Sequence, residues 1–139
     1  LGALIGSIVC AQYGKFKSIA LVVGGGNIEI LARESMLDSM VNIRYSLLKN
    51  KISTYDLAQR WKDLDPLHWI SYFDHTPVSF FNASKDIIIP PECTWALFER
   101  IPSPKKIFWF PTGHGLLFER YFGVPKKIID LFRQISNQK

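Results

Sequence analysis

The sequence has few of the residues that build metal centres and disulfide frameworks. Its 139 residues include two cysteines, Cys10 and Cys93, and three histidines. Each cysteine stands among apolar neighbours, where a free thiol behaves as a small hydrophobe, and this favours a reducing, cytoplasmic compartment. Neither an H-x-x-x-H spacing nor a pair of closely spaced cysteines is present, so we predict no metal site.

Long apolar runs and long runs of like charge are missing as well. The apolar stretch 1–11 is shorter than the roughly 20 residues that cross a bilayer, and it lacks the basic region of a signal peptide. The net charge is +5, from 17 Lys and Arg against 12 Asp and Glu. These cations come in separated pairs, such as Lys105 and Lys106, rather than in one cluster. We therefore expect no membrane span and no nucleic-acid partner.

The composition that is present, 47% hydrophobic and 14% aromatic, is typical of one folded domain with a core. Three short apolar runs bounded by Gly, Pro, Asn or Lys predict buried strands of a parallel sheet, at 19–23, 78–81 and 107–110. A helix that starts near Pro91 connects the second run to the third, as in a βαβ unit. Further helices are predicted at 1–11, apolar on nearly all sides and therefore buried, and from Pro125 onward.

The segment between the first two strands is much longer than a crossover needs. It carries two apolar stripes at helical spacing, and Ser53 followed by Asp56 is typical of a capping box. We interpret residues of about 27–75 as a helical insertion, or lid, over the edge of the sheet. Because three strands are few for a parallel sheet, we expect 1–139 to be a partial domain. Its uncovered edge would bind a missing amino-terminal half or a second copy.

The glycines after the first strand are a weak candidate for a phosphate-binding loop. Gly24 and Gly26 supply G-x-G, but Glu29 stands where the third glycine of the motif belongs. This pattern favours a tight exit from the strand, close to a neighbouring loop, and no cofactor is predicted.

Asp86 and His114 are the candidate catalytic residues, because each follows the end of a predicted strand. The carboxyl ends of parallel strands meet at one edge, so the carboxylate can accept the Nδ1 proton and leave Nε2 as a base. Taken singly, the aspartate also suits a turn and the histidine a surface position. His68 and His75 precede a strand at its amino end, so we interpret them as packing or capping residues.

The order of these features resembles the α/β-hydrolase superfamily, in particular its dienelactone-hydrolase-like and acyl-esterase members. There the nucleophile, the acid and the histidine follow in that order, with the nucleophile on a G-x-S-x-G elbow before a buried helix. Leu1 and Gly2 look like the last two letters of that elbow. The segment LGALIGSIVCAQYGKFKSIALVVGGGNI resembles the elbow helix and the next strand, and FNASKDIIIPPECTWALFERIPSPKKIFWFPTGHG resembles the acid and histidine segments. The resemblance covers nearly the whole chain and is weakest across 35–63.

The resemblance implies the carboxyl-terminal part of a serine-type acyl hydrolase that acts on a small ester or thioester substrate without a cofactor. His114 would be the base, Asp86 would orient it, and the backbone N–H of Leu1 would be one oxyanion donor. The nucleophile is not in this chain, since Ser7 lies inside the elbow helix without the glycine bracket. The chain alone is therefore expected to be inactive.

Two questions stay open at this point. The aromatic residues of the insertion either wall the substrate pocket or belong to ordinary packing; they are Trp61, Trp69, Tyr72 and Phe73. The alternative to an acyl hydrolase is a non-catalytic fragment or interaction module that keeps part of the hydrolase fold.

Overall fold

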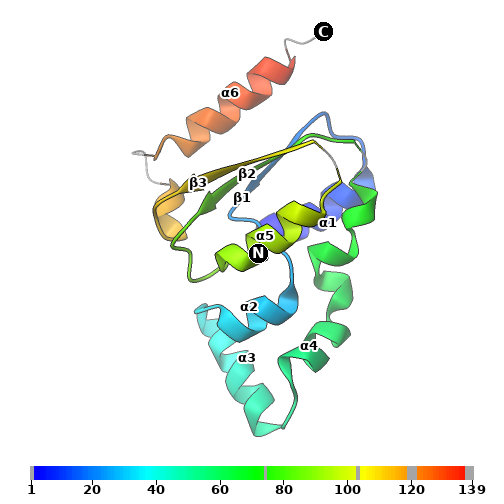
Figure 1. The fold of residues 1–139 in the computed structure, drawn as a ribbon, viewed down its shortest axis with the longest axis vertical. Helices are drawn as coiled ribbons and strands as arrows, with labels where there is room; N and C mark the ends of the chain where they lie inside the picture. Colours follow the sequence, from blue (N-terminus) through cyan, green and yellow to red (C-terminus); the bar gives the residue numbers. More distant parts are fainter. Residues whose placement is uncertain (1, 74, 103, 119–121, 137–139) are drawn as a thin grey trace.

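The computed structural model describes residues 2–73, 75–102, 104–118 and 122–136. Its centre is a parallel sheet with the strand order β1-β2-β3 (Figure 1). The strands are β1 (Ile19–Val22), β2 (Val78–Ala83) and β3 (Lys105–Phe110). The three predicted parallel strands are confirmed, with β2 extending to Ala83 and β3 starting at Lys105.

One face of the sheet is covered by helices α1 (Gly2–Tyr13) and α5 (Pro91–Arg100) (Figure 1). Phe80 of β2 and Leu97 of α5 are fully buried in the main core between these layers. Helix α5 begins at Pro91, as predicted, since a proline in the first turn has no N–H to leave unpaired.

The opposite face is covered by the short turn η4 (Gly115–Phe118) and by helix α6 (Val124–Ser136). Val124 is fully buried there against Phe81 and Phe110, whereas Phe108 of β3 is 40% exposed and stacks on Phe81. The expectation that all three strands are covered on both faces is therefore wrong for β3, whose side chains alternate in burial.

Helix α1 is less buried than its apolar sequence predicts. Within it only Ser7 and Ala11 are buried, while Ile5 and Val9 are 49% and 51% exposed. The small side chains of Ser7 and Ala11 face the body of the molecule, where they allow close packing, whereas Ile5 and Val9 point away from it.

The segment between β1 and β2 is helical, as predicted. It contains α2 (Ile28–Glu34), α3 (Asp38–Lys49) and α4 (Thr54–Arg60), followed by three 3₁₀ turns. These helices gather at the end of the molecule opposite α6 and enclose a small core of their own, formed by Ala32, Leu47 and Leu57 (Figure 1). The predicted capping box at the start of α4 is confirmed, because Ser53 and Asp56 exchange both of its hydrogen bonds.

Asp65 joins the two ends of this insertion, 27–28 and 65–67, which we call its neck. Its carboxylate accepts hydrogen bonds from the backbone N–H groups of Asn27 and Ile28, where the chain leaves the sheet, at 2.9 and 2.7 Å. It also accepts from the N–H of Leu67, where the chain returns, at 2.9 Å. One side chain thus joins two segments that are far apart in the sequence. No helix in the described ranges is long and apolar enough to cross a membrane.

Candidate active site

The loops after β2 and β3 lie side by side because hydrogen bonding between them continues past the strand ends. Ser84 donates its backbone N–H to the carbonyl of Phe110 at 2.8 Å, and Lys85 donates to the carbonyl of Thr112 at 3.0 Å. This pairing brings Asp86 and His114 to the same carboxyl edge of the sheet.

Asp86 and His114 form a direct hydrogen bond, as their positions after the two strands predict. His114 Nδ1 lies 2.8 Å from Asp86 Oδ2. The other carboxylate oxygen, Oδ1, accepts the backbone N–H groups of Ile88 and Ile89, so the aspartate is held from both sides. With an ionised carboxylate as acceptor, Nδ1 carries the proton and Nε2 keeps a free lone pair.

The Asp86 and His114 side chains differ strongly in exposure. The Asp86 side chain is 1% exposed, which strengthens its attraction for a positive charge, whereas the His114 side chain is 32% exposed. The imidazole is therefore anchored at one edge and accessible at the other. This arrangement can take up and return a proton at Nε2.

A cavity of about 500 Å³ lies beside His114. The start of α1, the end of β1, helices α2 and α3, and the loop after Asp86 all contribute to it. Among the described residues that line it, none is Asp, Glu, Lys or Arg, and Ser39, Cys93 and His114 have the only polar side chains. Burial raises the pKa of the Cys93 thiol to about 12, so this thiol is neutral and unreactive near neutral pH.

The wall of the cavity is tied to the loop that carries Asp86. The buried Ser35, between α2 and α3, donates its hydroxyl to the carbonyl of Ile88 at 2.6 Å. The backbone N–H of Met36 donates to the carbonyl of Ile87 at 2.7 Å. The insertion and the acid loop therefore hold one another in place.

The glycines after β1 serve close packing. A Cβ at Gly25 would lie 2.9 Å from Cys93 Cβ, and one at Gly26 would lie 2.8 Å from Leu67 Cγ. The N–H of Gly26 already donates to the carbonyl of Cys93. This confirms the interpretation as a tight strand exit, close to neighbouring segments.

The other residues that the sequence singles out lie as follows. Leu1, the predicted oxyanion donor, lies outside the described residues. Ser7 is fully buried and donates to the carbonyl of Ala3, which agrees with its exclusion as nucleophile. His68 contacts Asp63 at 3.4 Å, and neither it nor His75 lines the cavity.

Of the two alternatives for the aromatic residues of the insertion, pocket wall or ordinary packing, the structure supports ordinary packing. None of the four lines the cavity. Trp69 and Phe73 pack on the main core, Trp61 packs within the insertion, and Tyr72 is exposed. Aliphatic residues of α2 and α3 take that place, and sequence periodicity could not separate them from core positions of the insertion.

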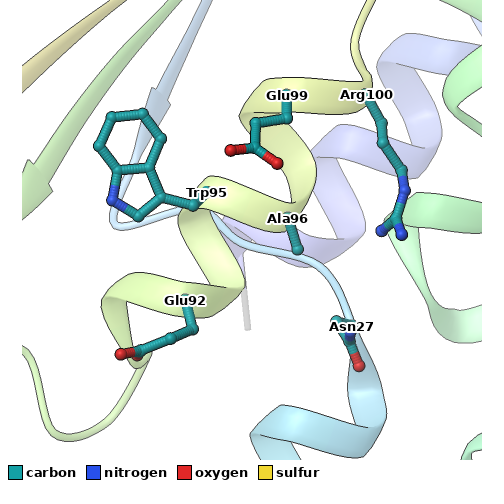
Figure 2. Close-up of a pocket in the computed structure, with 6 residues that line it drawn as sticks. All are labelled: Asn27, Glu92, Trp95, Ala96, Glu99 and Arg100. Atoms are coloured by element: carbon teal, nitrogen blue, oxygen red, sulfur yellow. The ribbon is translucent and has the colours of Figure 1, made fainter.

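A second hollow, of about 590 Å³, runs along α5 and the start of α2, and no sequence pattern predicts it (Figure 2). Glu92, Glu99 and Arg100 project around it beside Trp95, and the catalytic candidates do not line it. In the ranges with described coordinates, no three His, Cys, Asp or Glu side chains gather as metal ligands.

The comparisons with known proteins identify the fold. No protein-family model matches the chain, and neither does any curated protein. Among solved structures, an acylaminoacyl peptidase from Pyrococcus horikoshii superposes with a TM-score of 0.74 at 15% identity. A metagenomic α/β-hydrolase enzyme from lagoon sediment in Morocco gives 0.61 at 14% identity. The chain has part of an α/β-hydrolase fold.

The match spans most of this chain and only part of each hydrolase. It covers 95% of this chain and 22% of the peptidase, and 98% of this chain and 59% of the metagenomic enzyme. An acetyl xylan esterase from a Paenibacillus species superposes over 97% of this chain and 42% of its own length, with a TM-score of 0.62 at 18% identity. The chain thus spans about a fifth of the peptidase, and the hydrolase fold is what these likenesses share.

Proposed function

We propose that this chain is the carboxyl-terminal part of a serine-type acyl hydrolase that cleaves a carboxylic ester or thioester through an acyl-enzyme. The observation that carries the proposal is the 2.8 Å contact between His114 Nδ1 and the buried Asp86 carboxylate, at the edge of a hydrolase-type sheet. The cavity beside His114 supports it, because it offers a substrate a place next to the base.

The chemistry assigned to His114 is proton transfer at Nε2. As the nucleophile's hydroxyl oxygen attacks the carbonyl carbon, Nε2 takes the hydroxyl proton, and it returns this proton to the leaving oxygen or sulfur when that bond breaks. Water then repeats the sequence on the acyl-enzyme and releases the acid. Asp86 stabilises the imidazolium in both halves and holds the ring in the productive tautomer.

The proposal places the nucleophile directly before Leu1, whose N–H would be an oxyanion donor. Ser7 is engaged and buried, and Cys93 is neutral, so neither of these competes for the role. The insertion of about 27–75 acts as a lid whose α2 and α3 cover the substrate. A dienelactone-hydrolase-like subfamily remains a prediction from the sequence.

The second candidate function is a non-catalytic interaction module with a partial hydrolase fold. The exposed aliphatic face of α1 favours it, since Ile5 and Val9 offer apolar surface to another protein segment.

Hydrolysis of activated esters and thioesters separates the two functions. In a protein that carries this chain and the residues encoded upstream, His114→Ala and Asp86→Asn should each lower kcat/KM by about 10⁴-fold, because each removes part of the proton relay. Asp63→Asn, an exposed carboxylate outside the site, is the matched control and should leave the rate unchanged.

The 139-residue chain alone should hydrolyse these esters at the background rate. Turnover above background that is lost in His114→Ala would place the nucleophile inside the chain. Turnover in the longer protein that survives both substitutions would reject the proposed function.

A further inference from the structure

We propose that the cavity beside His114 holds an uncharged aliphatic chain of the substrate and that Leu31 and Met40 set its length. The link to hydrolysis rests on the proposed function, whereas the binding of an aliphatic chain does not. The chain can belong to the acid or to the alcohol of the ester.

The chemistry of the cavity walls favours an uncharged ligand. Among the described lining residues there is no Asp, Glu, Lys or Arg, and the Cys93 thiol is held neutral by burial. A carboxylate or ammonium group on the substrate would lose its hydration there, and the described lining offers it no Asp, Glu, Lys or Arg as an ionic partner. The cavity therefore selects against charged substituents.

The kind of side chain in the walls, and the volume they enclose, favour a linear alkyl chain. The described lining residues include no Phe, Trp or Tyr, and branched or flexible aliphatic side chains project from three separate segments, represented by Ile28, Met40 and Ile89. A volume of about 500 Å³ falls within the range of small-molecule sites and is far larger than an acetyl group needs. Flexible aliphatic walls suit a linear alkyl chain better than a flat ring, which gains most from aromatic partners.

Val23, which also lines the cavity, has an unusual backbone conformation. This lining residue has a φ of 48°, in the left-handed region, which is costly for a β-branched side chain. Its N–H is held by the carbonyl of Phe81 at 2.9 Å. Strained residues concentrate at ligand sites, and here the strain holds a valine at the cavity.

Position links the cavity to the reaction. His114 is itself a lining residue, so an alkyl chain bound in the cavity brings its attached ester group to the imidazole. Leu31 and Met40 come from the insertion, which makes α2 and α3 the part of the fold that determines chain length.

Two homologous ester series test the proposal in the longer, active protein. One series lengthens the acid from acetate to decanoate, and the other lengthens the alcohol from methyl to decyl. We expect kcat/KM to rise about fourfold per methylene in one series, up to a limit, and to stay flat in the other. The responding series shows which part of the ester occupies the cavity. Flat profiles in both would overturn the proposal.

Substitutions of Met40 on α3 test whether this residue sets the length of the alkyl chain. Met40→Trp should shift the optimum to shorter chains and Met40→Ala to longer ones, and circular dichroism should show that both variants fold. Leu48→Trp on the same helix is the matched control, since Leu48 is 78% exposed and does not line the cavity. An optimum that does not move in either Met40 variant would reject the assignment.

Binding to the 139-residue chain separates this proposal from the proposed function. Methyl octanoate should bind more tightly than methyl butanoate and much more tightly than the monomethyl ester of a dicarboxylic acid, as measured by ligand-observed NMR, also in His114→Ala. Such binding without hydrolysis in the longer protein would reject the function and keep the subsite. Hydrolysis that depends on His114, without a preference for chain length, would support the proposed function and reject the aliphatic subsite.

Discussion

Single residues on α5 show how burial sets chemical behaviour. Cys93 is 1% exposed because Gly25, without a side chain, allows the strand exit to approach α5 closely. Desolvation is the main cause that raises its pKa from 9.0 to about 12, and the nearby carboxylates of Asp65, Glu34 and Glu92 add to it. The thiol therefore behaves as part of the core rather than as a reactive group.

This shift predicts how stability depends on pH. In the unfolded chain Cys93 ionises near its ordinary pKa, whereas in the folded protein it keeps its proton up to about pH 12. The unfolded state therefore loses the proton first, so the thiol's contribution is complete below about pH 9 and is lost as the pH rises toward 12. Urea unfolding should show the free energy falling more steeply with pH in the native protein than in Cys93→Ala.

Cys10→Ala is the control for this measurement, because burial also raises the pKa of Cys10, though the thiol is only partly buried. It should reduce the pH dependence less than Cys93→Ala does. Parallel curves for the native protein and Cys93→Ala would contradict the prediction.

Among the elements, the insertion depends on its neck. The Asp65 carboxylate accepts hydrogen bonds from three backbone N–H groups at the two ends of the insertion. Helices α2 and α3, which line the cavity, lie between these two ends. A second attachment is the hydrogen bond from Ser35 to the carbonyl of Ile88, in the loop after Asp86, so the insertion is fixed at two places. The small core of α2, α3 and α4 keeps it together between them.

Asp65→Ala should lower the free energy of unfolding by about 2–4 kcal/mol, because it leaves several partly buried N–H groups without an acceptor. The measurement is urea unfolding followed by tryptophan fluorescence. Asp63→Ala should change stability by less than about 0.5 kcal/mol, since its side chain is 70% exposed. Equal effects of the two substitutions would show that the neck contributes nothing specific.

Across the whole molecule, the apolar surface is unevenly covered. Strand β1 pairs with β2 on one side, and on its other side no strand is present among the described residues. Helix α1 next to it exposes about half of the Ile5 and Val9 side chains. Open strand edges beside apolar surface favour association.

We therefore expect the chain to self-associate at micromolar concentration, as measured by sedimentation velocity. Replacing Ile5 and Val9 together by lysine should lower the apparent mass, because the added charges oppose burial of this surface. Ile129→Lys is the control: it is half exposed on α6, which covers the opposite face of the sheet. A native chain that sediments as a stable monomer would contradict the prediction.

The sequence by itself determined the local elements and the order of the candidate residues. Apolar runs bounded by turn residues mark the strands, Pro91 marks the start of α5, and Ser53 with Asp56 marks the start of α4. These signals depend on near neighbours in the chain, so they can be recognised without the fold. The positions of Asp86 and His114 after consecutive parallel strands were enough to predict their contact.

Only the tertiary structure decided what surrounds that pair. The aliphatic character of the cavity, the exposure of Ile5, the left-handed backbone of Val23 and the Asp65 neck all depend on segments that are distant in the sequence. An apolar residue at helical spacing can face a core, a cavity or solvent, and the choice is made by the surface packed against it. For this reason the contact between Asp86 and His114 could be predicted from the sequence, whereas the chemistry of the cavity beside it could not.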